Sequence, residues 1–299
     1  MAEKRRTAIM GVLNVTPDSF SDGGRFMDTG RRDTGRRDTG RVDVGRAVAH
    51  AERMVAEGAD IIDVGGESTR PYSLPVSLDE ELRRTIRVVT DLARGLPPGV
   101  EISVDTTKAE VARQALEAGA RVINDVSALR SDPDMARVAA AVGARVVLVH
   151  MRGTPVDMQM APVYHDVVAE VLSFLAERVD FATQAGIPRE RLLIDPGIGF
   201  GKTLEHNLTL LRHVGRFKEL GCPVLVGPSR KAFLEAACGA RQGERDGATA
   251  ACVALLVAAG VSVVRVHDVR RAGEAALLAE AIHGASGGKT PGGRAGRPC

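Results

Sequence analysis

One repeating pattern constrains the fold of this chain more than any other feature. A short apolar run, a polar loop and a stretch of helical period follow one another eight times. Most of the runs are continuous rather than alternating, which is typical of parallel strands buried on both faces. They begin near Ile9, Ile61, Ile102, Val122, Val146, Leu192, Val224 and Val263. Helices are expected between them, for example at residues 45–57, 79–92, 108–118 and 167–185.

Eight strand–helix units in 299 residues predict a single α/β domain, a (β/α)8 TIM barrel over residues 7–283. An open, doubly wound sheet is the alternative, and the strand count favours the barrel. Residues 1–6 are expected to form an N-terminal extension, and the glycine-rich residues 284–299 a disordered tail. The repeat DTGRR fills residues 28–41 and offers no apolar side chain to bury, so it predicts a long, flexible first loop.

Composition excludes several classes of partner. The formal net charge is only +2, and three of the positive charges lie in the C-terminal tail, so nothing favours binding to nucleic acid or to a membrane surface. The longest apolar stretch, residues 250–264, is too short to span a bilayer. The four cysteines fit no zinc or disulfide pattern, which indicates free thiols in a reducing compartment. These observations predict a cytoplasmic protein.

Polar residues stand at the end of almost every predicted strand. They are Asn14, Asp63, Asp105, Asn124, Asp125, His150, Asp195, Ser229, Arg265 and His267. A single aspartate in such a place is most often a helix N-cap. In a barrel, however, the carboxyl ends of the strands converge on one mouth, where active sites are built. The whole set therefore predicts a polar active site at the mouth.

Two segments near the C-terminus suggest an anion site. In VLVGPSRKAFL (224–234), Ser229 is expected to cap a helix whose N-terminus suits a carboxylate or phosphate. Lys231 would then oppose the helix dipole, which marks it as a candidate functional residue. In VVRVHDV (263–269), Arg265 and His267 are two residues apart and share a strand face, which is costly inside a barrel unless they meet an anion.

Three other segments suggest substrate contacts. IIDVGGESTRP (61–71) ends in Thr69 and Arg70, which suit phosphate oxygens. LLIDPGIGFGK (192–202) matches neither a Walker loop nor a Rossmann fingerprint, and its glycines would let the backbone approach a flat ligand. GVLNVTPDSFSDGG (11–24) is either an N-capping loop with a packed phenylalanine or a lid that closes on an anion and an aromatic substrate. The candidate lid residues are Asp18, Ser19 and Phe20.

Taken together, these segments resemble the dihydropteroate synthase family of pterin-binding barrels. SVDTTK (103–108), INDVSAL (123–129) and HMRGTP with DMQMAP (150–162) complete the likeness, which runs in order from residue 11 to residue 269. The resemblance implies a transferase that joins 6-hydroxymethyl-7,8-dihydropterin pyrophosphate to p-aminobenzoate and releases pyrophosphate in folate biosynthesis. It also implies Mg²⁺ as cofactor, a homodimer as the common assembly and sulfonamides as inhibitors.

The resemblance also implies roles for matching residues. Asn124 and Asp195 would read the pyrimidine edge of the pterin. Asp105 would pair with ring nitrogens and offset positive charge as the C–O bond breaks, and Lys231 would donate to the pterin carbonyl. Asn14 would be an oxygen ligand of Mg²⁺. The catalytic set would be Asp105, Lys231, Arg265 and His267.

The remaining implied contacts concern the leaving group and the second substrate. Thr69, Arg265 and His267 would hold the pyrophosphate. Ser229 would take the carboxylate of p-aminobenzoate, and Phe200 and Pro71 would flank its ring. The implied substrate-binding set is Thr69, Arg70, Pro71, Asp105, Asn124, Asp195, Phe200, Ser229, Lys231, Arg265, Val266 and His267.

Two rival functions are weaker. Methyltetrahydrofolate-dependent corrinoid methyltransferases use the same type of barrel but hold no pyrophosphate, so Arg265 with His267 and the TPDSFSDGG segment argue against them. A non-catalytic pterin-binding paralogue would be favoured by the loss of Asn14, Phe20 or Lys231, and all three are present.

Overall fold

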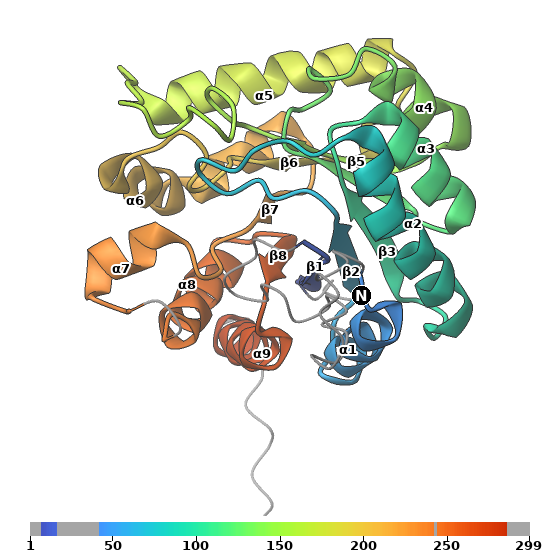
Figure 1. The fold of residues 1–299 in the computed structure, drawn as a ribbon. Helices are drawn as coiled ribbons and strands as arrows, with labels where there is room; N and C mark the ends of the chain where they lie inside the picture. The colour runs from blue at the N-terminus through green and yellow to red at the C-terminus, as the bar shows by residue number, and fades with distance from the viewer. Residues whose placement is uncertain (1–6, 17–41, 242–243, 286–299) are drawn as a thin grey trace, which may run out of the picture.

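The chain forms a nearly closed parallel barrel. The computed structural model describes residues 7–16, 42–241 and 244–285. Within these ranges, eight strands form one parallel sheet in the order β6-β5-β4-β3-β2-β1-β8-β7. A single parallel bridge between Ile194 and Val224 brings the two edge strands together. The helices stand around the outside of the strands (Figure 1). The predicted TIM barrel is confirmed, and the open doubly wound sheet is not what forms.

Each strand begins within one residue of its predicted position. The strands are β1 Ala8–Asn14, β2 Ile61–Gly65, β3 Glu101–Asp105, β4 Val122–Asp125, β5 Arg145–Val149, β6 Leu192–Asp195, β7 Leu225–Val226 and β8 Val263–Val266. The α-helices of the described ranges are α1 Val44–Ala56, α2 Leu78–Gly95, α3 Ala109–Ala118, α4 Met135–Val142, α5 Val167–Gln184, α6 Leu204–Arg212, α7 Ala232–Cys238, α8 Asp246–Ala258 and α9 Val269–Ala285. Two 3-10 helices, η1 Arg189–Arg191 and η2 Val214–Leu220, lie before β6 and after α6.

Polar side chains fix where several helices begin. Asp43, Ser77 and Asp166 each accept a hydrogen bond from a backbone N–H in the first turn of the helix that follows. Thr203 and His206 form a reciprocal capping box at the start of α6. These caps satisfy backbone N–H groups that the start of a helix leaves unpaired. Each of these four helices therefore starts at a defined residue behind its strand.

Strand residues alternate between two apolar layers. One residue in two joins the large cluster between strands and helices, for example Ile62, Val64 and Val264. The residues between them fill the barrel interior in a smaller cluster. Its buried members are Met10, Ile61, Val122, Val147, Val149, Leu193, Leu225 and Val263. This alternation decides which side chains at the strand ends can face the interior.

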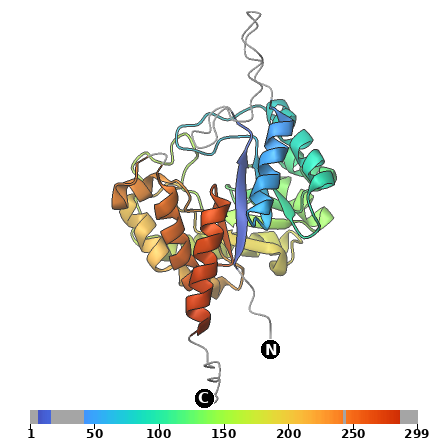
Figure 2. The ribbon, with the colours of Figure 1, turned by 90° about the horizontal axis from the view of Figure 1, so that it is seen from below.

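The loop from β2 to α2 extends over the end of the barrel at which the strands finish (Figures 1 and 2). Its Tyr72 N–H donates to Pro155 O in the loop after β5, at 2.8 Å. No helix in the described ranges has the length and apolarity needed to cross a membrane. The predicted N-terminal extension, the lid residues Asp18, Ser19 and Phe20, and the repeat at residues 28–41 lie outside the described residues. Helix α9 continues two residues past the predicted domain end at residue 283.

Candidate active site

Strand alternation selects which polar strand ends face the mouth. Asp105, Asn124 and Asp195 each follow, by one position, an outward residue of the large cluster, so they point inward. Asp125 and His150 stand at outward positions, so the expectation that every polar strand end faces the mouth is wrong for these two. The Asp125 carboxylate instead accepts from Ser127 N at 2.8 Å and stabilises its own turn.

Arg265 lies at the centre of the interior polar cluster. Its Nε donates to Asp63 Oδ2 at 2.6 Å, and its Nη2 donates to Asp105 Oδ2 at 2.8 Å. Asn124 Nδ2 donates to the same Asp63 oxygen at 3.1 Å. The Asp63 side chain is fully buried, and that of Asp105 is 6% exposed. Asp63 was recognised from the sequence only as a polar strand end, and the structure makes it the residue that orients both Arg265 and Asn124.

Three buried oxygen atoms of this cluster have no partner among the described residues. They are Asp63 Oδ1, Asp105 Oδ1 and Asn124 Oδ1. Leaving a buried acceptor unpaired costs roughly 1–3 kcal/mol, so such groups in one place indicate a ligand that supplies N–H donors. Burial raises the pKa of Asp105 to about 7, although the nearby Arg265 charge opposes the rise. The arrangement suits a polar heterocycle.

Asp195 and Lys231 form the other side of the mouth, away from the cluster of Asp63, Asp105 and Asn124. Asp195 Oδ1 accepts from Gly197 N at 2.7 Å, and burial raises the pKa of this carboxyl. Lys231 Nζ donates to Ile198 O and lies 4.5 Å from the centre of the Phe200 ring. Burial lowers the pKa of Lys231 to about 8, with the Asp195 charge opposing the change. At neutral pH the lysine is therefore mostly a charged donor.

Ser229 does not cap a helix, which corrects the prediction from the sequence. Helix α7 begins at Ala232, with Lys231 in the N-cap position and no side-chain cap. The Ser229 hydroxyl instead accepts from His267 N at 3.1 Å and lies 2.9 Å from His267 Nδ1. The prediction that Lys231 lies in the first turn of the helix is also wrong, because this residue precedes the helix.

Cationic groups gather around His267. Burial lowers the pKa of this imidazole well below its ordinary value, and the charges of Arg230, Arg265, Arg70 and Lys231 act in the same direction. A group that feels several positive charges lies where an anion would be strongly attracted. This part of the mouth can therefore bind a polyanion such as pyrophosphate.

Asn14 ends β1 beside Gly65 of β2. A side-chain carbon at Gly65 would lie 3.3 Å from Asn14 Oδ1 and 3.6 Å from Asp105 Cβ. The glycine thus leaves open the space between an amide oxygen and a carboxylate. Hard oxygen donors of this kind are those that Mg²⁺ prefers, usually with waters and substrate phosphates completing its shell. The residues present fit the expected ion.

The loop that carries Thr69, Arg70 and Pro71 is anchored by a partly buried ion network. Lys108 Nζ donates to Glu67 Oε2 at 2.5 Å and to Glu81 Oε2 at 2.6 Å. Thr69 and Arg70 are partly buried, and Pro71 is exposed at the turn. The network holds the start of the loop against α2 and the start of α3, so its tip reaches over the mouth from a fixed base.

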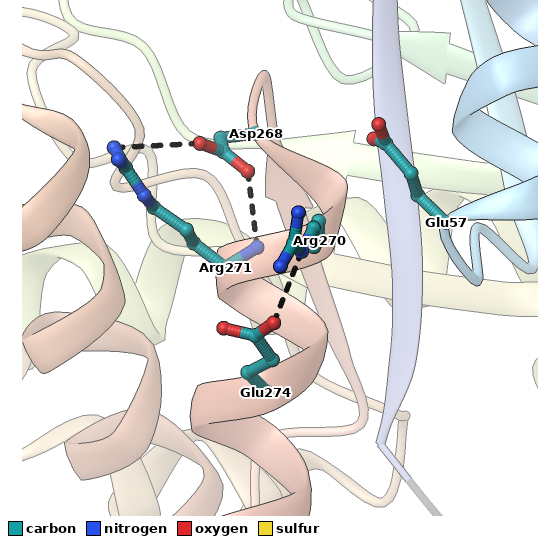
Figure 3. A pocket seen from close by; sticks show the side chains of 5 residues that line it. All are labelled: Glu57, Asp268, Arg270, Arg271 and Glu274. Carbon is teal, nitrogen blue, oxygen red and sulfur yellow. Dashed lines mark hydrogen bonds and ion pairs between the residues drawn. The ribbon is translucent and has the colours of Figure 1, made fainter.

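Two features lie apart from the mouth. The Val266 side chain is buried in the cluster between strands and helices, so it offers no side chain to a ligand. A surface pocket of about 360 Å³ lies on the outside of the barrel, lined by Glu57 and the first turns of α9 (Figure 3). Its charged side chains largely pair with one another, as Arg270 does with Glu274 and Arg271 with Asp268.

Comparison with known proteins agrees with this geometry. Residues 10–267 match the family described as pterin binding enzymes. The dihydropteroate synthase of Synechocystis sp. is 44% identical over 279 residues, which cover 93% of this chain and 91% of the relative. The chain belongs to the dihydropteroate synthase family.

Solved structures from the dihydropteroate synthase family share the fold. The Yersinia pestis enzyme, solved with a sulfonamide drug, superposes with a TM-score of 0.85 at 39% identity and covers 93% of this chain and 95% of its own. The Xanthomonas albilineans enzyme, solved with 4-aminobenzoic acid, has a TM-score of 0.82 at 44% identity, with 94% of each chain covered. The predicted family, fold and enzyme class are therefore confirmed.

Proposed function

We propose that this chain joins 6-hydroxymethyl-7,8-dihydropterin pyrophosphate to p-aminobenzoate, giving 7,8-dihydropteroate and pyrophosphate. One observation carries the proposal. Buried carboxylate and amide oxygens of Asp63, Asp105 and Asn124, which have no partner in the described part of the chain, lie at the same mouth as a cationic group centred on Arg265. A pterin offers N–H donors on its ring, and its pyrophosphate is a polyanion. The two halves of the site match the two halves of that substrate.

The acidic half would bind and orient the pterin. Asp195 would accept two N–H bonds from the pyrimidine edge, with Asn124 beside it. Lys231 would donate to the pterin carbonyl, since its pKa of about 8 keeps it mostly protonated at neutral pH. Asp105 would pair with ring nitrogens and counter positive charge on the ring. Each of these side chains is already held in place by the strand end or loop that carries it. Little reorganisation of the site is therefore needed when the pterin binds.

The cationic half would hold the leaving group. Arg265, His267, Thr69 and Arg70 would bind the phosphate oxygens and bear the charge that develops on them. We expect Asn14 to supply one amide oxygen to Mg²⁺, which when bound neutralises part of the pyrophosphate charge. The C–O bond at the exocyclic carbon breaks, and its electron pair leaves with pyrophosphate. The amine lone pair of p-aminobenzoate forms the new C–N bond, and the amine loses one proton to solvent.

The second substrate would lie between the loops over the mouth. Ser229 would hydrogen-bond the carboxylate of p-aminobenzoate, and Phe200 and Pro71 would flank its ring. The backbone of Val266 passes between Arg265 and His267, so any role in binding belongs to its main chain. The relative solved with a sulfonamide supports the proposal that sulfonamides compete for this place. Asp18, Ser19 and Phe20, the lid residues expected from the sequence, lie outside the described residues.

The assembly and location are also proposals. Four large apolar side chains are exposed on the neighbouring helices α8 and α9 (Figure 1), namely Leu255, Leu277, Leu278 and Ile282. Because exposed apolar groups of this kind are typical of interfaces, we propose that a second copy of the chain covers them. The described cysteines Cys222, Cys238 and Cys252 are free thiols, which supports a reducing cytoplasm.

Pyrophosphate release measured with and without p-aminobenzoate tests the reaction. Release is expected only when both substrates are present, and Lys231→Met should reduce it at least tenfold. Lys218→Met is the matched control, since this exposed lysine on η2 donates to Ala259 O on the outside of the barrel. Pterin binding without any release would identify a non-catalytic paralogue. Methyl transfer from methyltetrahydrofolate would instead support the methyltransferase.

A further inference from the structure

A buried lysine next to the mouth has no part in the proposed chemistry. Lys202 follows the glycine-rich loop after β6 and is 3% exposed. Its Nζ lies 2.9 Å from His150 Nδ1, 2.9 Å from Phe200 O and 3.4 Å from His150 O. Burying a charged ammonium group is costly. Burial accordingly lowers the pKa of Lys202 well below its ordinary value, with the Asp195 charge opposing the change. Its nitrogen has three polar atoms within hydrogen-bond distance, so the buried amine is satisfied.

The contacts of Lys202 join two loops that approach unusually closely. Gly197 has φ +69°, and a side-chain carbon there would lie 1.8 Å from His150 O. Gly201 has φ +64°, and a side-chain carbon there would lie 2.4 Å from Arg152 O. Only glycine fits in both places. The loop after β6 is therefore pressed against the segment after β5, and the lysine fastens the two together.

The fastened loop carries groups that the proposed function needs. Gly197 N donates to Asp195, and Ile198 O accepts from Lys231. Phe200, whose carbonyl binds Lys202, presents its ring to Lys231. A shift of this loop would move the Phe200 ring and the acceptor of Lys231 together. Its position thus controls the side of the mouth where p-aminobenzoate is proposed to lie.

His150 is the residue that Lys202 contacts in the segment after β5. Its ring packs edge-on against Phe174, with 4.8 Å between centroids, and burial lowers its pKa to about 2. The neutral imidazole can therefore share one hydrogen bond with the Lys202 amine through Nδ1. The residue that the sequence placed among the polar strand ends thus faces outward to hold a lysine.

We propose that Lys202, together with His150, is a positioning pair that sets the loop after β6, and through it Phe200, for p-aminobenzoate. The inference rests on the proposed function. Neither side chain is placed against a reacting atom. Their effect would spare pyrophosphate, because Arg265 and His267, which would bind it, are held by Asp63, Asp105 and Ser229.

Lys202→Met tests the pair, because it keeps the length of the side chain and removes every donor. The KM for p-aminobenzoate is expected to rise at least tenfold, with a smaller change in kcat. The Kd for pyrophosphate, measured by calorimetry on the protein alone, should stay within twofold of wild type. Lys218→Met, which removes one lysine bond to a backbone carbonyl on the outside of the barrel, should change neither value.

Equal weakening of pyrophosphate and p-aminobenzoate would overturn the inference, because it would mean general damage to the barrel. So would a KM indistinguishable from that of Lys218→Met. If Lys202→Met yields too little folded protein, His150→Phe tests the same link, since it keeps an aromatic ring and removes one of the three polar contacts of Lys202. A wild-type protein that does not consume p-aminobenzoate would instead refute the proposed function.

Discussion

Arg265 should be essential to the stability of the barrel interior, in a way that depends on pH. It bridges two buried carboxylates through bonds of 2.6 and 2.8 Å. Arg265→Met keeps much of the volume but leaves Asp63 and Asp105 facing each other without a cation. Breaking a buried pair by removing one partner costs about 3–5 kcal/mol. We expect that loss in the free energy of unfolding at pH 8.5.

The pH dependence follows from Asp105. Burial already raises its pKa to about 7, and Arg265 is the charge that most opposes the rise, so the variant should have a higher value still. A folded pKa above the unfolded value, about 3.9, means that the native state binds the proton more tightly. The stability contributed by that proton is complete below about pH 4 and is lost as pH rises through the folded pKa. Between pH 7 and 8.5 the wild-type contribution levels off, while that of the variant keeps falling by up to about 1.4 kcal/mol per pH unit.

Urea unfolding at pH 5.5, 7 and 8.5 would measure this, with Arg270→Met as the control. Arg270 lies on the first turn of α9, is 74% exposed and pairs with Glu274 at the surface, so its loss should change little at any pH (Figure 3). If Arg265→Met lost the same stability at all three pH values, the two carboxylates would not be what the arginine stabilises. A loss below about 1 kcal/mol at pH 8.5 would refute the reasoning altogether.

Three further outcomes are expected. Asp195→Asn should weaken binding of the pterin pyrophosphate by about 2–4 kcal/mol in calorimetry without unfolding the protein, since an amide presents a donor where the ligand also donates; unchanged affinity would contradict the assignment. His267→Ala should weaken pyrophosphate and the pterin pyrophosphate but hardly affect a pterin without phosphates, and equal losses would place the residue elsewhere. Deleting residues 31–40, two repeat units, should leave melting temperature and turnover unchanged, because loop closure entropy varies only slowly with length; a salt-dependent rise in KM for the pterin pyrophosphate would instead indicate electrostatic steering.

The barrel could be predicted from the sequence because each strand is a compact apolar run bounded by polar residues. The period of these runs is local information, and it located every strand start within one residue. Which strand-end residue faces inward depends on where the alternation begins, and continuous apolar runs conceal that. His150 and Asp125 were therefore grouped with Asp195 and Asn124, although they face the other way.

Other features of the site depend on contacts between distant segments. Serine is a residue type typical of N-caps, which is why Ser229 is expected to cap a helix. In the structure, however, its hydroxyl contacts His267, 38 residues later, and α7 starts after Lys231. The link from Lys202 to His150 spans 52 residues. No local pattern reports such pairs, and only the packing of one loop on another creates them. The resemblance to a family supplied roles for residues, whereas the structure supplied the neighbours that hold them.

The barrel should open more easily at the seam between β6 and β7 than elsewhere along the sheet. Five residue pairs join β1 to β2, whereas one bridge joins the segments of β6 and β7. Backbone amides along this seam should exchange with solvent deuterium sooner than those of β1 and β2, because local opening there breaks fewer bonds. Asp195 lies on one side of the seam and Ser229 on the other. A ligand that touches both residues would hold the two sides of the seam together. Slower deuterium exchange of these amides would therefore report directly that the ligand is bound.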